Sequence, residues 1–326
     1  MYIQDLKFSL WADFIERDYL DNEFKDLIQR GIINGATSNP AIFKNAILNS
    51  PAYKEQLKSL EGLSAKEKYE ALAIHDIKKA ASILQVLFND GNDGYVSIEV
   101  DPFLCDDADA TIEEGKRLFA EIDYKNVMIK VPATTAGYIA MEKLTSEGIP
   151  VNATLIFKKE QAISCARAFE RGSKKHGSKV DTVISIFVSR IDRAIDEILR
   201  KKGLDEALGG IYNSANIYTT IQDMNIDGCR ALFASTGVKG DSLPPYYYVE
   251  KLLAYNSVNT APIDTILVYD RDGGKEKALP ISNEVIKEYF DSLINAGIDF
   301  EAVLDKQIED GLDSFKDSFN DILEAL

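Results

Sequence analysis

Histidine is nearly absent from this sequence, which has only His75 and His176 among its 326 residues. Both lie in polar, helix-like segments, and neither has a partner at a catalytic or metal-binding spacing. We therefore expect both on the surface. The scarcity excludes Ser/His/Asp and Cys/His nucleophiles and most zinc sites, because these depend on imidazole.

Cysteines and long apolar runs are also scarce. Cys105, Cys165 and Cys229 lie far apart without Cys-x-x-Cys spacing, so the sequence predicts neither a disulfide framework nor a zinc knuckle and fits reduced thiols. No apolar stretch comes close to the length of a membrane-spanning helix, which needs about 18 residues. The first residues lack the basic segment of a secretion signal. We expect a cytoplasmic protein that does not associate with membranes.

Positively charged residues are outnumbered as well: the sequence has 37 Lys and Arg against 53 Asp and Glu, which gives a formal net charge of −16. This balance argues against a nucleic-acid partner or an anionic membrane surface, although a local basic pocket remains open. The segment 237–240 lacks the glycine-rich nucleotide patterns. The aspartates at 106, 107 and 109 lack the glycine and glutamate of a calcium loop and are typical of a helix N-terminus. We expect no bound metal and no nucleotide, whereas phosphate binding stays open.

What the sequence has in abundance is short segments in which polar and aliphatic residues alternate. With a side-chain period of two, each such strand turns one side toward surrounding helices and the other toward a shared interior. The segments are 9–13, 35–39, 95–100, 127–131, 151–155, 183–188 and 231–235, with a weaker eighth at 257–260. In the segment 231–235, Phe233 and Ser235 are expected to share the inner side.

Helix-like segments alternate with these strands, a rhythm typical of repeated βα units. The sequence therefore predicts an α/β fold, a single (β/α)8 barrel domain over residues 1–326 with its reaction site at the C-terminal mouth. Two extra helical patterns are expected between the second and third strands, from 40 to 93, where Ser64 and Glu67 predict a capping box. Terminal helices are expected at 283–296 and 300–326. Phe315 and Phe319 are expected in the core, with packing near the site as the alternative.

Lys130 is the anomaly among these strands, because it interrupts the apolar run Val127-Met128-Ile129-Lys130-Val131 and points inward. Burial disfavours the charged form of a lysine, and a neutral amine can attack a carbonyl to form a Schiff base. A lysine that snorkels to solvent or pairs with a carboxylate is the alternative, and by itself the commoner one. Inward Asp13 and Glu99 on other strands favour the reactive lysine, since buried carboxylates are costly without a task.

The motifs around these residues resemble those of the transaldolases. Two segments resemble the family signatures, Thr37-Ser38-Asn39-Pro40-Ala41-Ile42-Phe43 and the run 127–134 around the Schiff-base lysine. Further similar segments are 11–13, 98–101, 151–157, 187–190 and 234–239, and the order and spacing are similar to the longer bacterial type. The resemblance implies a (β/α)8 barrel that needs no cofactor and transfers a dihydroxyacetone unit between sugar phosphates in the non-oxidative pentose phosphate pathway.

The resemblance also implies a role for each site residue. Lys130 would attack the keto carbon of sedoheptulose 7-phosphate or fructose 6-phosphate, and Asp13 would exchange a proton with the C4 hydroxyl. Glu99 and Thr154 would hold the catalytic water. The other substrate-binding residues would be Asn39, Asn152, Ser185 and Phe187. For Asn152 and Ser185, a polar interior side chain satisfied by its neighbours is an equal alternative.

The phosphate would be held just beyond the sixth and seventh strands. Arg190 can grip it bidentately, unless it forms a surface ion pair with Asp196 or Glu197. Ser235 would donate to the same phosphate, as in many barrels of this kind.

At one position the chain departs from the shorter transaldolases, which place an arginine two residues after that serine. This sequence has Gly237 there. Lys239 is the nearest replacement cation, and backbone N–H groups of the glycine-bearing turn are an alternative.

Two other functions remain open. Fructose 6-phosphate aldolases are similar but release free dihydroxyacetone, and they typically carry glutamine and tyrosine where this chain has Glu99 and Phe187. A barrel that only binds sugar phosphates is disfavoured by the presence of both Lys130 and Asp13. The expected partners are sugar phosphates, with a second copy of the chain as a possible homodimer, as in many family members.

Overall fold

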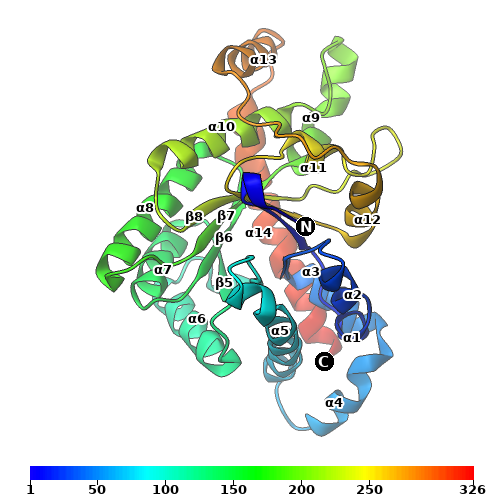
Figure 1. The fold of residues 1–326 in the computed structure, drawn as a ribbon, viewed down its shortest axis with the longest axis vertical. Helices are drawn as coiled ribbons and strands as arrows, with labels where there is room; N and C mark the ends of the chain where they lie inside the picture. The colour runs from blue at the N-terminus through cyan, green and yellow to red at the C-terminus, as the bar shows by residue number, and fades with distance from the viewer.

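The computed structural model describes residues 1–326 and shows a closed barrel (Figure 1). Parallel strands pair in chain order, and pairing of the first with the last closes the ring. The strands are β2 (Phe8–Ala12), β3 (Gly35–Thr37), β4 (Val96–Glu99), β5 (Val127–Pro132), β6 (Val151–Ile156), β7 (Thr182–Phe187), β8 (Cys229–Ala234) and β9 (Ser257–Ala261). A short strand, β1 (Tyr2–Ile3), pairs antiparallel with β2. The predicted (β/α)8 barrel is confirmed, including its weak eighth strand.

Helices surround the barrel and fill the connections between strands. They are α1 (Arg17–Asp21), α2 (Glu23–Gln29), α3 (Pro40–Asn49), α4 (Lys54–Ser59), α5 (Ala65–Asn89), α6 (Ala108–Ile122), α7 (Thr135–Ser146), α8 (Lys159–His176), α9 (Ser189–Lys202), α10 (Gly209–Met224), α11 (Tyr247–Lys251), α12 (Ile263–Asp272), α13 (Asn283–Asn295) and α14 (Phe300–Ala325). None of them combines the length and the apolar character that a membrane crossing requires.

The long connection between β3 and β4 differs in one respect from the prediction of two helical patterns. The first pattern is broken into α3 and α4 at Pro51, because proline lacks an N–H and disfavours helical backbone in Ser50 before it. The second pattern is α5, and the predicted capping box between Ser64 and Glu67 is confirmed.

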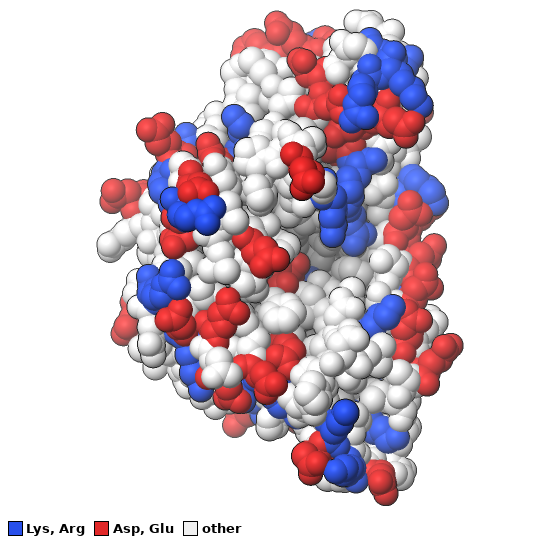
Figure 2. Space-filling model, turned by 90° about the vertical axis from the view of Figure 1, so that its right-hand side faces the viewer, with Lys and Arg blue, Asp and Glu red and all other residues white.

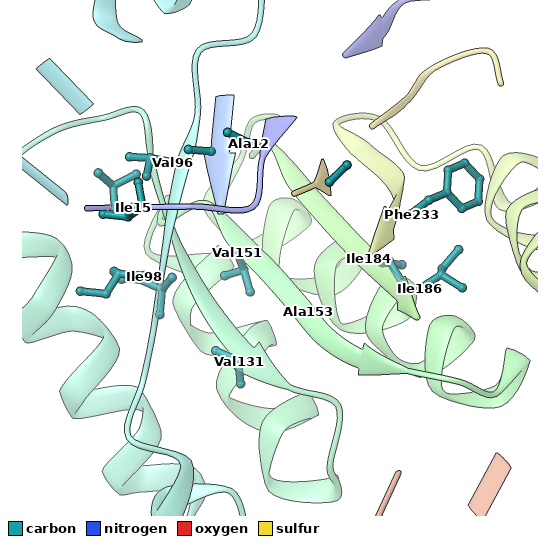
Figure 3. Close-up of a cluster of buried hydrophobic side chains, with 14 of the residues drawn as sticks. Ala12, Ile15, Val96, Ile98, Val131, Val151, Ala153, Ile184, Ile186 and Phe233 are labelled. Carbon is teal, nitrogen blue, oxygen red and sulfur yellow. The ribbon is translucent and has the colours of Figure 1, made fainter. Parts of the chain in front are cut away.

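Aliphatic side chains on the outer side of the strands form the main apolar layer between barrel and helices (Figure 3). Examples from five different strands are Ala12, Ile98, Val131, Ala153 and Ile186, all at or below 2% exposure. The predicted alternation is therefore confirmed for these strands. Burying this layer is the main favourable contribution to folding, since stabilisation scales with the apolar area removed from water.

Strand β8 is the exception to the predicted facing. Phe233 lies in the outer layer, where its ring centroid is 6.1 Å from that of Tyr218 on α10, while Leu232 and Ala234 face the interior. The prediction that Phe233 shares the inner side with Ser235 is wrong. Ser235 has a positive φ of 55°, so the left-handed backbone ends the strand alternation and turns its side chain into the interior cavity.

The end of the barrel away from its mouth is filled around Trp11, which is fully buried. Gly35 makes room for the indole, since a Cβ there would lie 2.6 Å from Nε1 of Trp11. The indole N–H donates to Asp93 at 2.8 Å, and Arg230 pairs with the same carboxylate at 2.8 Å. We call Trp11, Asp93 and Arg230 the barrel floor.

The barrel floor leads to a stability prediction. The side chains of Arg230 and Asp93 are 14% and 3% exposed, so Arg230→Ala leaves a buried carboxylate without its cation. Because breaking a buried pair costs about 3–5 kcal/mol, we expect the free energy of unfolding in urea to fall by about 3 kcal/mol. Arg200→Ala is the control, since its pair with Glu206 is exposed and solvent screening leaves such pairs weak. Equal losses in both variants would contradict a structural role for the floor.

Candidate active site

The C-terminal ends of the strands open into a cavity of about 560 Å³. Most of the predicted site residues line it, namely Asp13, Asn39, Lys130, Thr154, Ser185, Phe187, Arg190, Ser235 and Lys239. Glu99 and Asn152 are not in the lining, but each contacts a residue that is. The tertiary structure therefore gathers the predicted residues at one end of the barrel. No group of three or more His, Cys, Asp or Glu side chains is arranged to hold a metal ion.

Lys130 lies on β5 directly opposite Glu99 of β4 in the strand register. It is 5% exposed, its Nζ lies 3.2 Å from Oε2 of Glu99, and it donates a hydrogen bond of 3.1 Å to the backbone carbonyl of Ser38. The predicted inward direction is confirmed, and the alternative that Lys130 snorkels to solvent is excluded. The other alternative was that Lys130 pairs with a carboxylate. Such a pair is present, but its carboxylate belongs to Glu99, which is itself a predicted site residue.

Glu99 and Thr154 both carry buried oxygen atoms that are available to a ligand. The contact of Glu99 with Lys130 is close enough for an ion pair but departs from hydrogen-bond angles, and neither carboxylate oxygen has a hydrogen bond within the chain. Oγ1 of Thr154 also has no partner. Burial raises the pKa of Glu99 to about 7 against the attraction of Lys130. Buried oxygens of this kind can hold a water molecule and exchange protons with it.

Asp13 follows β2 and reaches the cavity beside two threonines. Its Oδ1 accepts a hydrogen bond of 2.6 Å from Thr37, whose hydroxyl also lies 2.6 Å from that of Thr260. Since the Thr37 hydroxyl has one hydrogen, Thr260 is the donor in the second bond. Burial raises the pKa of Asp13, and Lys130 is the largest influence that opposes it. A carboxyl group in this setting can both accept and return a proton.

The amides predicted to bind hydroxyl groups are oriented by hydrogen bonds. Ser185 donates to the side-chain carbonyl of Asn152 at 2.6 Å, and the amide of Asn152 donates to Ser97 at 3.0 Å. These bonds agree with the alternative that Asn152 and Ser185 are interior residues satisfied by their neighbours. One amide hydrogen of Asn152 nevertheless has no hydrogen-bond partner. Asn39 is the N-cap of α3 and accepts from the Ile42 N–H at 3.0 Å, so its NH2 group remains available to the cavity.

Arg190 lies in the first turn of α9 with its guanidinium 5.2 Å from the ring centroid of Phe187. It forms no ion pair, because Glu197 pairs with Lys201 and Asp196 accepts the Ala207 N–H. The alternative that Arg190 forms a surface ion pair with Asp196 or Glu197 is therefore excluded. The half-buried arginine faces the cavity instead.

Arg193 is a cavity residue that the sequence interpretation missed. It lies one helical turn beyond Arg190, and its guanidinium contacts the hydroxyl of Ser189 at 3.4 Å, which in turn is 3.1 Å from that of Ser235. Burial and the charge of Arg193 lower the pKa of Arg190, and neither arginine has a carboxylate partner. The Arg-x-x-Arg spacing in a predicted helix is the signal that could have found it.

Basic groups therefore gather at one side of the cavity. The half-buried Arg190 and the exposed Arg193 and Lys239 line it in a protein that is strongly acidic as a whole. Figure 2 shows a hollow in the surface with basic side chains along its edge. Such a group attracts and holds an anion.

Helix α14 crosses the barrel and borders the same cavity (Figure 1). It contributes Ser314 and Phe315, while Ala41, Ile42 and Asn45 of α3 line another part. Both the long β3–β4 connection and the C-terminal helix thus border the mouth. Phe315 is buried and lies at the cavity, with its ring centroid 5.5 Å from Nζ of Lys130, so the alternative of packing near the site is the correct one for this residue.

The raised pKa of Glu99 gives a prediction on pH and stability. Glu99 ionises near 4.5 when unfolded and near 7 in the folded chain, so between these values only the folded state holds the proton. Its contribution to stability therefore falls as the pH rises through this range. We expect urea unfolding to show that the stability of Glu99→Gln, relative to the unsubstituted protein, increases as the pH rises from about 5 to about 8. The half-exposed Glu121→Gln controls for loss of a charge, and a difference that stays constant with pH would contradict the raised pKa.

Comparison with known proteins agrees with this geometry. Residues 10–326 match the model of the transaldolase/fructose-6-phosphate aldolase family. A transaldolase of Campylobacter jejuni (strain 81-176) is 47% identical, and one of Helicobacter pylori (strain Shi470) is 43% identical, each aligned over 98% of this chain and 99% of the relative. A solved structure from Clostridium thermocellum is 10% identical with a TM-score of 0.36, which is too slight a likeness to bear on the function. The chain belongs to the transaldolase/fructose-6-phosphate aldolase family.

Proposed function

We propose that this protein is a transaldolase, which moves a dihydroxyacetone unit reversibly from sedoheptulose 7-phosphate to glyceraldehyde 3-phosphate and yields erythrose 4-phosphate and fructose 6-phosphate. The observation that carries the proposal is the buried Lys130 amine, 3.2 Å from Glu99 and in one cavity with Asp13. The names of the full-length relatives support the same activity. The free cysteines suit a reducing compartment, and we propose the cytoplasm as its location.

The first step joins the donor sugar to Lys130. The ammonium passes a proton to Glu99, whose raised pKa suits it to accept one near neutrality. The amine then attacks the keto carbon and forms a carbinolamine, which loses water to become an iminium ion. A water held between Glu99 and Thr154 relays the protons, because both side chains have oxygens without partners in the chain.

The second step breaks the bond between C3 and C4. Asp13 accepts the proton of the C4 hydroxyl, the aldose phosphate leaves, and the electron pair moves toward the iminium nitrogen to give an enamine on Lys130. In the reverse sense, C3 of the enamine attacks the acceptor aldehyde, and Asp13 returns the proton to its oxygen. The hydrogen bond from Thr37 orients Asp13 for both transfers.

The phosphate of either sugar is assigned to the basic side of the cavity. Arg190 and Ser235 hold it, and Arg193 supplies the second guanidinium that a shorter transaldolase has at the position of Gly237. Lys239 and Arg193 are both exposed, and Lys239 adds a third positive charge as a single ammonium that cannot bind bidentately. Two arginines without carboxylate partners support this assignment, since close like charges are disfavoured until an anion lies between them.

The covalent intermediate is directly testable. We expect sodium borohydride with fructose 6-phosphate to leave one adduct, located by mass spectrometry on Lys130, and no adduct in Lys130→Met. A coupled assay with and without erythrose 4-phosphate then separates transfer from simple cleavage to dihydroxyacetone. Active protein that gives no adduct, or an adduct on another lysine, would rule out the mechanism.

The phosphate assignment predicts a change in substrate affinity. A lost charge-assisted hydrogen bond is worth about 1.5–3 kcal/mol, so Arg193→Ala should raise the KM for fructose 6-phosphate at least about tenfold. The kcat should change little, because the contact is equal in ground and transition states. Lys239→Ala should act in the same direction but more weakly, and Arg200→Ala on the same helix serves as the control. An unchanged KM would remove Arg193 from the site.

A further inference from the structure

The aromatic ring beside the reacting amine comes from outside the barrel strands. We propose that Phe315 is a specificity-determining residue, which shields the Lys130 intermediate from water and so favours transfer to an aldehyde over release of free dihydroxyacetone. This inference rests on the proposed function, because it concerns the fate of the enamine on Lys130.

The position of Phe315 suits such a shield. The side chain is 4% exposed, and its ring centroid lies 5.5 Å from Nζ of Lys130. Glu99 and Ser38 contact the same amine from the barrel wall, whereas Phe315 approaches from the helix that crosses the mouth. The amine therefore has polar partners from the wall and an apolar partner from the helix.

The ring is held by close packing on both sides along the helix. Gly311 lies one turn before it, and a Cβ there would come within 2.9 Å of Leu155, so the helix backbone lies directly against the end of β6. Phe319 lies one turn after it and packs edge to face on Tyr69 with centroids 5.0 Å apart. Residues spaced by four share one face of a helix. Gly311, Phe315 and Phe319 thus fix this buried face over the site.

Ion pairs hold the outer part of the same helix. Lys158 pairs with Asp305 at 2.6 Å, and Lys44 of α3 pairs with Asp321 at 2.5 Å. These contacts are partly exposed and individually weak. They connect α14 to α3 and to the segment after β6, near both ends of the helix.

The enamine on Lys130 has two possible fates. In transfer, its C3 bonds to the aldehyde carbon and the aldehyde oxygen takes the proton from Asp13. In release, C3 takes a proton from water instead, the remaining hydroxide is neutralised by the proton on Asp13, and a second water adds to C2 so that the C–N bond breaks. Of the two fates, only release requires a water molecule at C3. An active site that excludes water therefore suppresses release of free dihydroxyacetone.

The test is the ratio of dihydroxyacetone released to dihydroxyacetone transferred, measured with fructose 6-phosphate and erythrose 4-phosphate. We expect Phe315→Ala to raise this ratio about tenfold, equal to about 1.4 kcal/mol of lost discrimination. Phe315→Leu keeps apolar bulk and should stay near the original ratio. Ile322→Ala is the matched control, since it removes a buried apolar side chain from the same helix and lines neither the cavity at Lys130 nor a cavity at Glu99. Phe315→Val serves in place of the alanine variant if that variant is unfolded.

Two outcomes overturn the inference. One is an unchanged ratio in Phe315→Ala or Phe315→Val. The other is an equal rise in Ile322→Ala, which would show general loosening of α14. Borohydride trapping on each variant separates this inference from the proposed function, because failure of the function abolishes the Lys130 adduct even in the unsubstituted protein.

Discussion

The buried contact between Lys130 and Glu99 is the constraint on which the site depends. Both groups are almost fully enclosed, and burial of two charges costs several kcal/mol per ion unless the partners compensate. The compensation here is incomplete, since neither oxygen of Glu99 has a directed hydrogen bond and its pKa rises to about 7. The rest of the barrel must supply the stability that this pair does not.

The two ends of the barrel divide stability from chemistry. At the floor, Trp11 fills the interior, and the carboxylate of Asp93 is bonded on two sides by Trp11 and Arg230. At the mouth, polar atoms lack partners, and the non-glycine residues Leu155 and Ser235 adopt positive φ. Strained backbone and unpaired polar atoms persist only where the surrounding structure holds them, and they are typical of functional sites.

Much of this was predictable, because the alternation of residues along a strand indicates which side chains point into the barrel and which point toward the helices. The inward directions of Asp13, Glu99, Lys130 and Thr154 follow from a period of two, as does the outer apolar layer. The prediction failed at Phe233, where the inner side was assigned from Ser235. The left-handed backbone at Ser235 shifts the phase by a local conformation that residue identity does not encode. Arg193 lies three residues after Arg190 in a predicted helix, so helical spacing could have identified it, but it was missed.

The sequence by itself determined the barrel, the reactive lysine and its carboxylates, because these depend on patterns within single short segments and on family motifs. Only the tertiary structure decided that Phe315 lies over Lys130 and that Arg193 joins Arg190 at the cavity. Contacts of this kind depend on barrel closure and on the path of α14 across the mouth. No local pattern specifies that path, since it follows from packing between residues far apart in the chain.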